Sequence, residues 1–165
     1  MDWSKVSQEM AEKILGQGET FLQATLTVAS GLDQRSATLA GIFSASATAA
    51  LGASAAIQIS DNGNCALVYA GLAVAATWFL GALLCVAALW PSKYHLPGNH
   101  PRNWWAESVS ERPMVEAIGG ESENYQEKID YNVNGLKWDS MFLKFGATVG
   151  CAAPLVGIIA WASLT

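Results

Sequence analysis

The chain has 165 residues, of which 52% are hydrophobic and only 14% are charged. This length suits one domain, and the composition is more apolar than that of most soluble domains, so we expect one compact membrane unit. The formal charge is −5 and Lys and Arg are not clustered, which excludes nucleic acid as a partner, because a phosphate backbone is bound by such clusters.

The first segment, residues 1–36, is mostly polar. Its apolar residues recur at helical spacing, at Val6, Met10, Ala11, Ile14 and Leu15. This recurrence predicts an amphipathic helix, and the segment is expected to form a cytoplasmic amphipathic arm. Because Gly16 and Gly18 follow, we expect the helix either to bend there or to restart before it reaches the membrane.

Residues 37–59 contain no charged residue and exceed the roughly 20 residues that cross a hydrocarbon core. This predicted first span consists mainly of Ala, Ser, Thr and Gly, which contribute little to insertion. Small residues recur at every fourth position in two adjacent rows, which include Gly41, Ser44, Ala45, Thr48, Ala49 and Gly52. Such rows let helix backbones approach closely. They predict an oligomer interface or a polar lining, or alternatively tight helix packing within one chain.

A turn at residues 60–64 leads into a second apolar stretch, residues 65–90, so residues 37–90 are predicted to form a transmembrane hairpin. The loop that follows is rich in Pro and Gly and contains Arg102, Trp104 and Trp105. Adjacent tryptophans just outside a span usually anchor it at the membrane interface. The alternative for these three residues is ligand contact through ring stacking and phosphate pairing.

Residues 91–144 are predicted to form a cytoplasmic region, with a loop to about Met114 and an amphipathic helix from Ser122. We expect this helix to continue without a break into residues 145–165, an uncharged stretch that is the predicted third transmembrane helix. The predicted fold class is therefore an all-α membrane protein with three transmembrane helices, an N-terminal amphipathic helix, and a cytoplasmic amphipathic helix continuous with the third span.

The positive charges predict the orientation of the chain. All nine Lys and Arg residues either precede the first span or lie between the second and third spans. The positive-inside rule assigns that side to the cytoplasm. We therefore expect the N-terminus in the cytoplasm and the C-terminus on the far side of the membrane.

Catalytic chemistry is not indicated by the sequence. No nucleophile with a base, carboxylate pair or metal-ligand cluster stands out, so we assign no catalytic residue, metal ligand or cofactor and expect no enzyme activity. His95 and His100 lie in the Pro- and Gly-rich loop, a pattern typical of surface histidines. Asp33 and Arg35 lie where the arm meets the first span. They predict a boundary with snorkelling side chains, or alternatively a sensor or gate at the helix junction.

The first span opens with the stretch Leu32-Asp33-Gln34-Arg35-Ser36-Ala37-Thr38-Leu39-Ala40-Gly41. The chain as a whole has the order amphipathic helix, two spans, polar segment, and a last amphipathic helix that continues into a third span. In this order and in this short element, the chain resembles the Pycsar-type transmembrane effectors of bacterial anti-phage defence. The resemblance implies a bacterial inner-membrane protein with a periplasmic C-terminus. Such a protein would respond to a cyclic nucleotide, assemble or rearrange, and impair the membrane, with Asp33 and Arg35 marking the helix junction.

Two functions therefore compete. In the first, the chain is a membrane-perturbing effector that self-associates through the small rows of the first span, with the lipid bilayer, further copies of itself and a cyclic nucleotide as partners. In the second, it is a structural or accessory subunit of a larger membrane complex, and the same rows pack against another protein. The two differ in oligomeric state and in neighbours rather than in any one residue.

Overall fold

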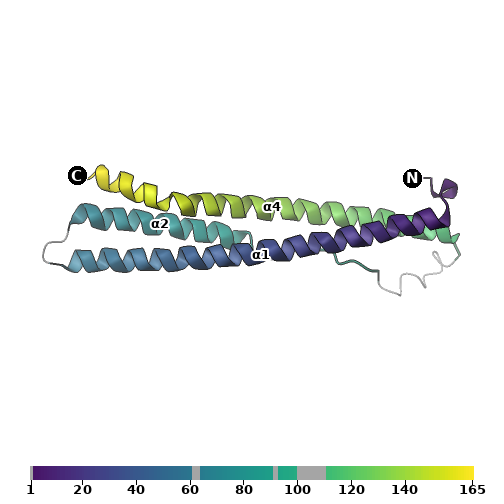
Figure 1. Cartoon of the computed structure of the whole chain (residues 1–165), viewed down its shortest axis with the longest axis horizontal. Coiled ribbons are helices and arrows are strands. Elements are labelled where there is room, and N and C mark those ends of the chain that lie inside the picture. The colour runs from purple at the N-terminus through teal and green to yellow at the C-terminus, as the bar shows by residue number, and fades with distance from the viewer. Residues whose placement is uncertain (1, 61–63, 91–92, 100–110) are drawn as a thin grey trace. The chain divides into compact units, whose positions relative to one another are not determined.

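The computed structural model describes residues 2–60, 64–90, 93–99 and 111–165, which form helices and no strand. A short 3-10 helix, η1 (Trp3–Lys5), precedes three α-helices, α1 (Gln8–Ile59), α2 (Cys65–Ala87) and α4 (Met114–Ala162) (Figure 1). All three α-helices are long and apolar enough to cross a membrane. The predicted all-α fold with three apolar spans is thus confirmed at the level of helix number, length and composition.

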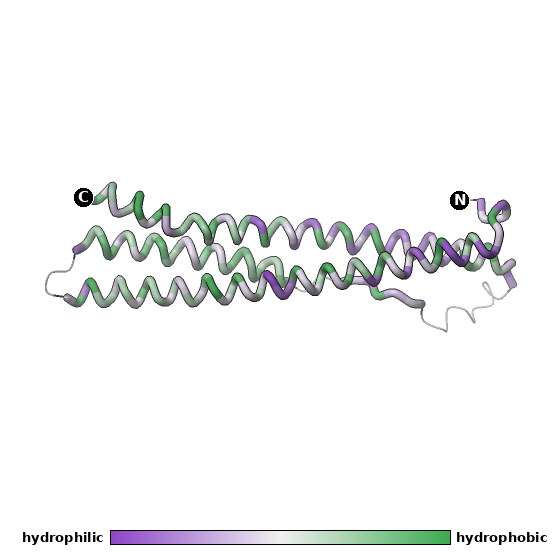
Figure 2. The backbone as a smooth tube through the Cα atoms, in the orientation of Figure 1, coloured by the Kyte–Doolittle hydropathy of each residue, from purple (hydrophilic) through white to green (hydrophobic). Residues whose placement is uncertain are grey.

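Local sequence explains where the helices begin. Asn64 caps α2, because its side-chain oxygen accepts hydrogen bonds from the backbone N–H groups of Ala66 at 2.9 Å and Leu67 at 3.4 Å. Pro113 precedes α4, a position that suits its fixed φ and its missing N–H donor. Hydrophobic and neutral residues dominate α2 along its whole length (Figure 2), as expected of a span that meets lipid.

Of the two alternatives expected near Gly16 and Gly18, a restart of the helix is wrong. α1 is one continuous helix from Gln8 to Ile59, so the arm and the first span share it. Gly18 lies against the side chain of Tyr125, where an added Cβ would be 3.5 Å from the Tyr125 Cβ. This is an ordinary van der Waals distance, and α1 continues through both glycines without a break.

The expected continuity of the last helix into the third span is confirmed, since α4 runs from Met114 to Ala162 and passes through Pro154 without ending. The chain divides into two compact units, each built from segments distant in sequence. The first unit contains Met1–Ser30 and Ser92–Leu136, and the second contains Gly31–Pro91 and Lys137–Thr165. We describe each by itself.

The first unit packs α1 against α4 around a small aromatic core. Leu22, Tyr125 and Ile129 form this core, and the partly buried Leu15 and Val133 pack against it. At the start of the chain, Trp3 packs over Gly119, and the Trp3 ring nitrogen donates a hydrogen bond to a Glu123 carboxylate oxygen at 2.9 Å. The Trp3 ring therefore holds the 3-10 helix η1 against α4.

The second unit packs α1, α2 and α4 side by side, with Ala40, Phe43, Ala82 and Cys85 at its centre (Figure 1). Glycines set the closest contacts. A Cβ added at Gly146 would lie 2.7 Å from the Cys85 sulfur and 3.0 Å from the Gly81 carbonyl oxygen. One added at Gly150 would overlap the Phe43 ring. The Gly146-x-x-x-Gly150 pair on α4 therefore lets α2 and Phe43 of α1 approach its backbone directly.

The directions of the helices in the second unit follow from these contacts. Gly81 of α2 meets Gly146 of α4, whereas Val74, earlier in α2, meets Gly157, later in α4, so these two helices are antiparallel. Gly71 of α2 meets Ser54, near the end of α1, so α1 and α2 are also antiparallel. α1 and α4 consequently run parallel, with their uncharged stretches side by side.

Candidate functional site

The small-residue rows predicted on the first span lie on the outer surface of the second unit. Gly41, Ser44, Ala45, Thr48, Ala49 and Gly52 are all exposed. The residues of α1 that are buried against other helices are Ser36, Ala40, Phe43, Ala47 and Ser54. At about 100° per residue these two sets face opposite directions. Among the described residues, the rows therefore face away from the contacts that α1 makes with the other helices. We call these six exposed residues the outer face of α1.

The outer face of α1 consists of small residues and is weakly polar. The Thr48 hydroxyl donates a hydrogen bond to the Ser44 carbonyl at 2.9 Å, within the same helix. A groove of about 510 Å³ runs along one edge of the face between α1 and α2. It is lined by Ser44, Ala47, Thr48, Leu51, Leu72, Ala75, Ala76 and Phe79. The surface offers close approach and apolar contact, with few polar groups.

The predicted helix junction lies at the start of the second unit, just before the uncharged stretch 37–59. Asp33 and Arg35 are both exposed, and their side chains do not form an ion pair with each other. Partial burial raises the pKa of the Asp33 carboxyl, and the Asp139 carboxylate on α4 raises it further. Ser36, the next residue of α1 after Arg35, is fully buried. The junction thus places two acidic groups near each other on α1 and α4.

The predicted interfacial or ligand-contacting residues Arg102, Trp104 and Trp105 lie outside the described residues, so their role stays a prediction. The described part of the same loop, residues 93–99, is held against α4 in the first unit. We call residues 93–99 the strap. Two groups of hydrogen bonds fix it, one near its middle and one at its end.

Asn132 holds the middle of the strap. Its side-chain oxygen accepts a hydrogen bond from the His95 backbone N–H, and its side-chain nitrogen donates one to the His95 carbonyl, both at 2.9 Å. Asn132 is 0% exposed, so both bonds are shielded from water. The His95 ring also stacks edge-on against Tyr131, with 5.0 Å between ring centroids. One amide side chain thus replaces the pairing that the strap backbone would find in a sheet.

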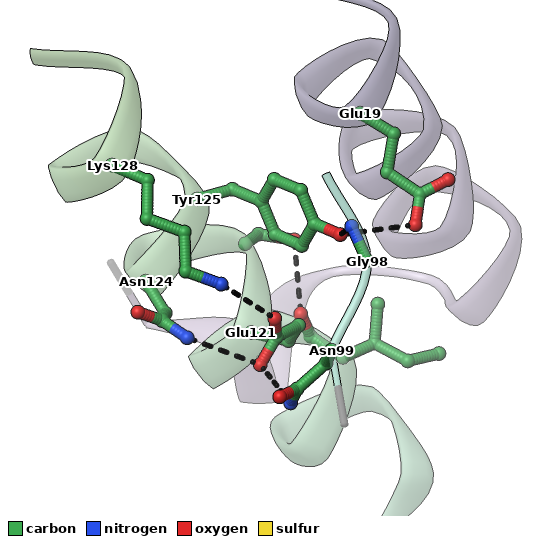
Figure 3. A network of polar contacts seen from close by, with 9 residues as sticks. Glu19, Gly98, Asn99, Glu121, Asn124, Tyr125 and Lys128 are labelled. Atoms are coloured by element: carbon green, nitrogen blue, oxygen red, sulfur yellow. Dashed lines mark hydrogen bonds and ion pairs between the residues drawn. The ribbon is translucent and has the colours of Figure 1, made fainter. Parts of the chain in front are cut away.

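Tyr125 holds the end of the strap (Figure 3). Its hydroxyl accepts a hydrogen bond from the Gly98 backbone N–H at 2.5 Å and lies 3.3 Å from a Glu19 carboxylate oxygen of α1. Gly98 has a φ of 92°, a conformation that glycine adopts without strain. Burial raises the pKa of the Tyr125 hydroxyl, and Glu19 and Glu121 add to the rise, although the Gly98 bond opposes it. Tyr125 therefore joins α1, α4 and the strap.

Glu121 completes this network beside Tyr125 (Figure 3). Its carboxylate accepts hydrogen bonds from Asn99 of the strap at 2.8 Å and from Asn124 at 3.4 Å. Lys128 lies 3.7 Å from the other carboxylate oxygen and 4.8 Å from the centre of the Tyr125 ring. The mostly buried Glu121 carboxylate is therefore held by two amides and one nearby cation, and its oxygen on the Lys128 side accepts no hydrogen bond from the described residues.

On the first unit, a second groove, of about 330 Å³, lies between α1 and α4. It is lined by Ile14, Gln17, Gly18, Phe21, Ser122, Tyr125, Gln126 and Ile129. Phe21 is 54% exposed at its edge. This groove combines amide and hydroxyl groups with an exposed aromatic ring, which suits a protein segment better than a small charged ligand.

The sequence interpretation missed the strap contacts and the contact glycines. Asn132 and Tyr125 lie on the amphipathic helix, and nothing local marks either as a partner of a loop some thirty residues earlier. Gly146 and Gly150 carried a usable signal, since a G-x-x-x-G pattern in an apolar stretch typically marks a helix contact. Comparison of the chain with known protein families, with curated proteins and with solved structures found no match.

Proposed function

We propose that this chain inserts in the membrane through its three apolar helices, self-associates through the outer face of α1, and perturbs the bilayer as an assembly. The observation that supports this most directly is the exposure of all six small residues of that face, opposite the surface that packs within the chain. Another helix with the same face can approach it closely.

The physical reason lies in the difference between lipid and protein contacts. A face of Gly, Ala, Ser and Thr gains little from lipid chains, whereas small residues let two helix backbones come close and gain van der Waals contact and interhelical hydrogen bonds. Identical faces on several copies favour a symmetric assembly. Such an assembly gathers the weakly hydrophobic faces of several copies in one place within the bilayer, and this local concentration of weakly hydrophobic surface is the feature that we propose perturbs the membrane.

The orientation and setting of the proposal come from the sequence. The distribution of Lys and Arg supports a cytoplasmic N-terminus and a C-terminus on the far side. The resemblance to Pycsar-type effectors supports the bacterial inner membrane, a role in anti-phage defence and a cyclic nucleotide as the signal. The first unit, with its strap and its groove, is then the part of the chain in the cytoplasm.

The test replaces Ala49 by Leu and measures the mass of the protein in mild detergent by size exclusion with light scattering. Leu fills the close-approach face, so the assembly should dissociate and growth arrest on induction should weaken. Cys151→Leu, an exposed small residue in the third span, is the matched control and should leave both unchanged. An Ala49→Leu protein with the mass and toxicity of the wild type would refute assembly through this face.

The second candidate is an accessory subunit of a larger membrane complex. The groove of the first unit favours it, because Phe21 and Ile14 offer an apolar surface flanked by amides where a partner segment would fit. Purification from the native host distinguishes the two: a homo-oligomer without other subunits supports the effector, whereas stoichiometric recovery with other membrane proteins supports the subunit.

A further inference from the structure

A third groove, in the second unit, lies between α1 and α4 at the start of their uncharged stretches. Its volume is about 570 Å³, within the range of about 300–1,000 Å³ that is typical of small-molecule sites. It is lined by Gln34, Arg35, Thr38 and Leu39 of α1 and by Leu143, Lys144 and Ala147 of α4. We call it the junction groove.

The junction groove carries two positive charges and no negative one. Arg35 comes from α1 and Lys144 from α4, and both are exposed. Within the described ranges neither cation has a carboxylate in ion-pair distance. Because α1 and α4 run parallel here, the two cations lie at the same end of the groove, one on each wall. The pair therefore forms a small cationic clamp open to an external anion.

Away from the clamp the groove becomes apolar. Leu39 and Ala147, each about one turn further along its helix than Arg35 and Lys144, line this apolar part, and Leu143 lines the groove beside Lys144. The Thr38 hydroxyl needs no hydrogen-bond partner from an occupant, because it already donates a hydrogen bond to the Gln34 carbonyl at 2.8 Å. Residues 37–59 and 145–165 contain no charge, so the apolar part of the groove points along the spans and away from the clamp. An occupant must be anionic at one end and apolar at the other.

We propose that the junction groove binds one anionic phospholipid, with its phosphate between Arg35 and Lys144 and the upper part of an acyl chain along Leu39, Leu143 and Ala147. Basic pockets between transmembrane helices on the cytoplasmic side suit anionic headgroups, and each Lys or Arg near the membrane surface strengthens such binding about fivefold. A zwitterionic lipid brings its own cation to the clamp and gains less. The site needs the helices to be in a membrane but does not need self-association.

The experiment is native mass spectrometry of the full chain in detergent, titrated with dioleoylphosphatidylglycerol or dioleoylphosphatidylcholine. We expect one tight phosphatidylglycerol per chain, bound at least about tenfold more tightly than phosphatidylcholine. Arg35→Gln and Lys144→Gln should each weaken phosphatidylglycerol about fivefold, and together about twentyfold or more. Lys137→Gln, which makes the same charge change at an exposed position of α4 outside the groove, should stay within about twofold of the wild type.

A second variant probes the apolar half without changing charge. Ala147→Leu fills the groove and should weaken phosphatidylglycerol binding while helix content and elution volume stay normal. Inorganic phosphate at millimolar concentration should not displace the lipid, because it cannot use the apolar wall. The single variants remain informative if the double variant fails to fold, which circular dichroism and elution volume would show.

Three results would overturn the proposal: equal affinity for the two lipids, a loss in Lys137→Gln as large as in Lys144→Gln, or displacement by inorganic phosphate, which would reduce the site to an anion clamp. The lipid titration is repeated on Ala49→Leu. Retained lipid selectivity in that variant separates the junction groove from the outer face of α1, so failure of one proposal does not imply failure of the other.

Discussion

Replacing Asn132 by Ala should release the middle of the strap from α4. Asn132 makes two hydrogen bonds at 2.9 Å to the main chain of His95, and the substitution leaves that N–H and that carbonyl without partners. Unpaired groups of this kind cost about 1–3 kcal/mol each, less when water reaches them. We therefore expect the local opening free energy of the strap to fall by about 2–3 kcal/mol.

The assay is hydrogen–deuterium exchange of the protein in nanodiscs, followed on a peptide that covers residues 93–99. The expected fall corresponds to about 30- to 150-fold faster exchange of the His95 amide. Amides of α2, in the other unit, should exchange as before. Asn134→Ala, an exposed asparagine two residues further along α4, is the control and should change nothing. Wild-type exchange at His95 in Asn132→Ala would show that the amide bonds do not hold the strap.

Two further predictions concern the second unit. Gly146→Ala should lower the thermal unfolding midpoint in detergent, with a cost of about 1–3 kcal/mol, because the new Cβ meets the Cys85 sulfur and the Gly81 carbonyl. Gly31→Ala, where the new Cβ has open space around it, is the control and should leave the midpoint unchanged. A Gly146→Ala protein with the same midpoint as the wild type would contradict the packing argument. Cys65 is exposed at the start of α2, on the opposite side of the membrane from a cytoplasmic N-terminus, so it should react with a membrane-impermeant maleimide in intact cells. If Cys65 were labelled only after lysis, the orientation would be the opposite of the predicted one.

Much of the helical layout could be predicted because it depends on local composition. An uncharged stretch longer than the hydrocarbon core is visible in the sequence, and all three such stretches lie in helices of the structure. The continuity of α4 followed in the same way from apolar spacing on both sides of Lys144. The restart expected at Gly16 and Gly18 was wrong, because an isolated glycine weakens a helix without having to end it, and α1 continues through both.

The candidate sites were less predictable because they depend on contacts between distant segments. Periodicity placed Ala45 and Ala49 on one face of a helix, but it carried no information on whether that face meets α2, α4 or the outside. The same holds for Arg35 and Lys144, which are more than a hundred residues apart in the chain and share one groove. The pairing of Asn132 with His95 likewise needs the fold before it can be seen.

The glycine contacts between α2 and α4 affect how substitutions are tolerated. An added methyl group would collide with the Cys85 sulfur at Gly146 and with the Phe43 ring at Gly150, and at Gly81 it would lie only 3.1 Å from the backbone of α4. By contrast, large apolar residues that face outward, such as Leu83 and Ile158, are at least half exposed, so exchange for another large apolar residue should cost little there. Over evolutionary time these contact glycines should therefore drift less than the outward-facing bulky residues of the same helices, the reverse of what a water-soluble core leads one to expect.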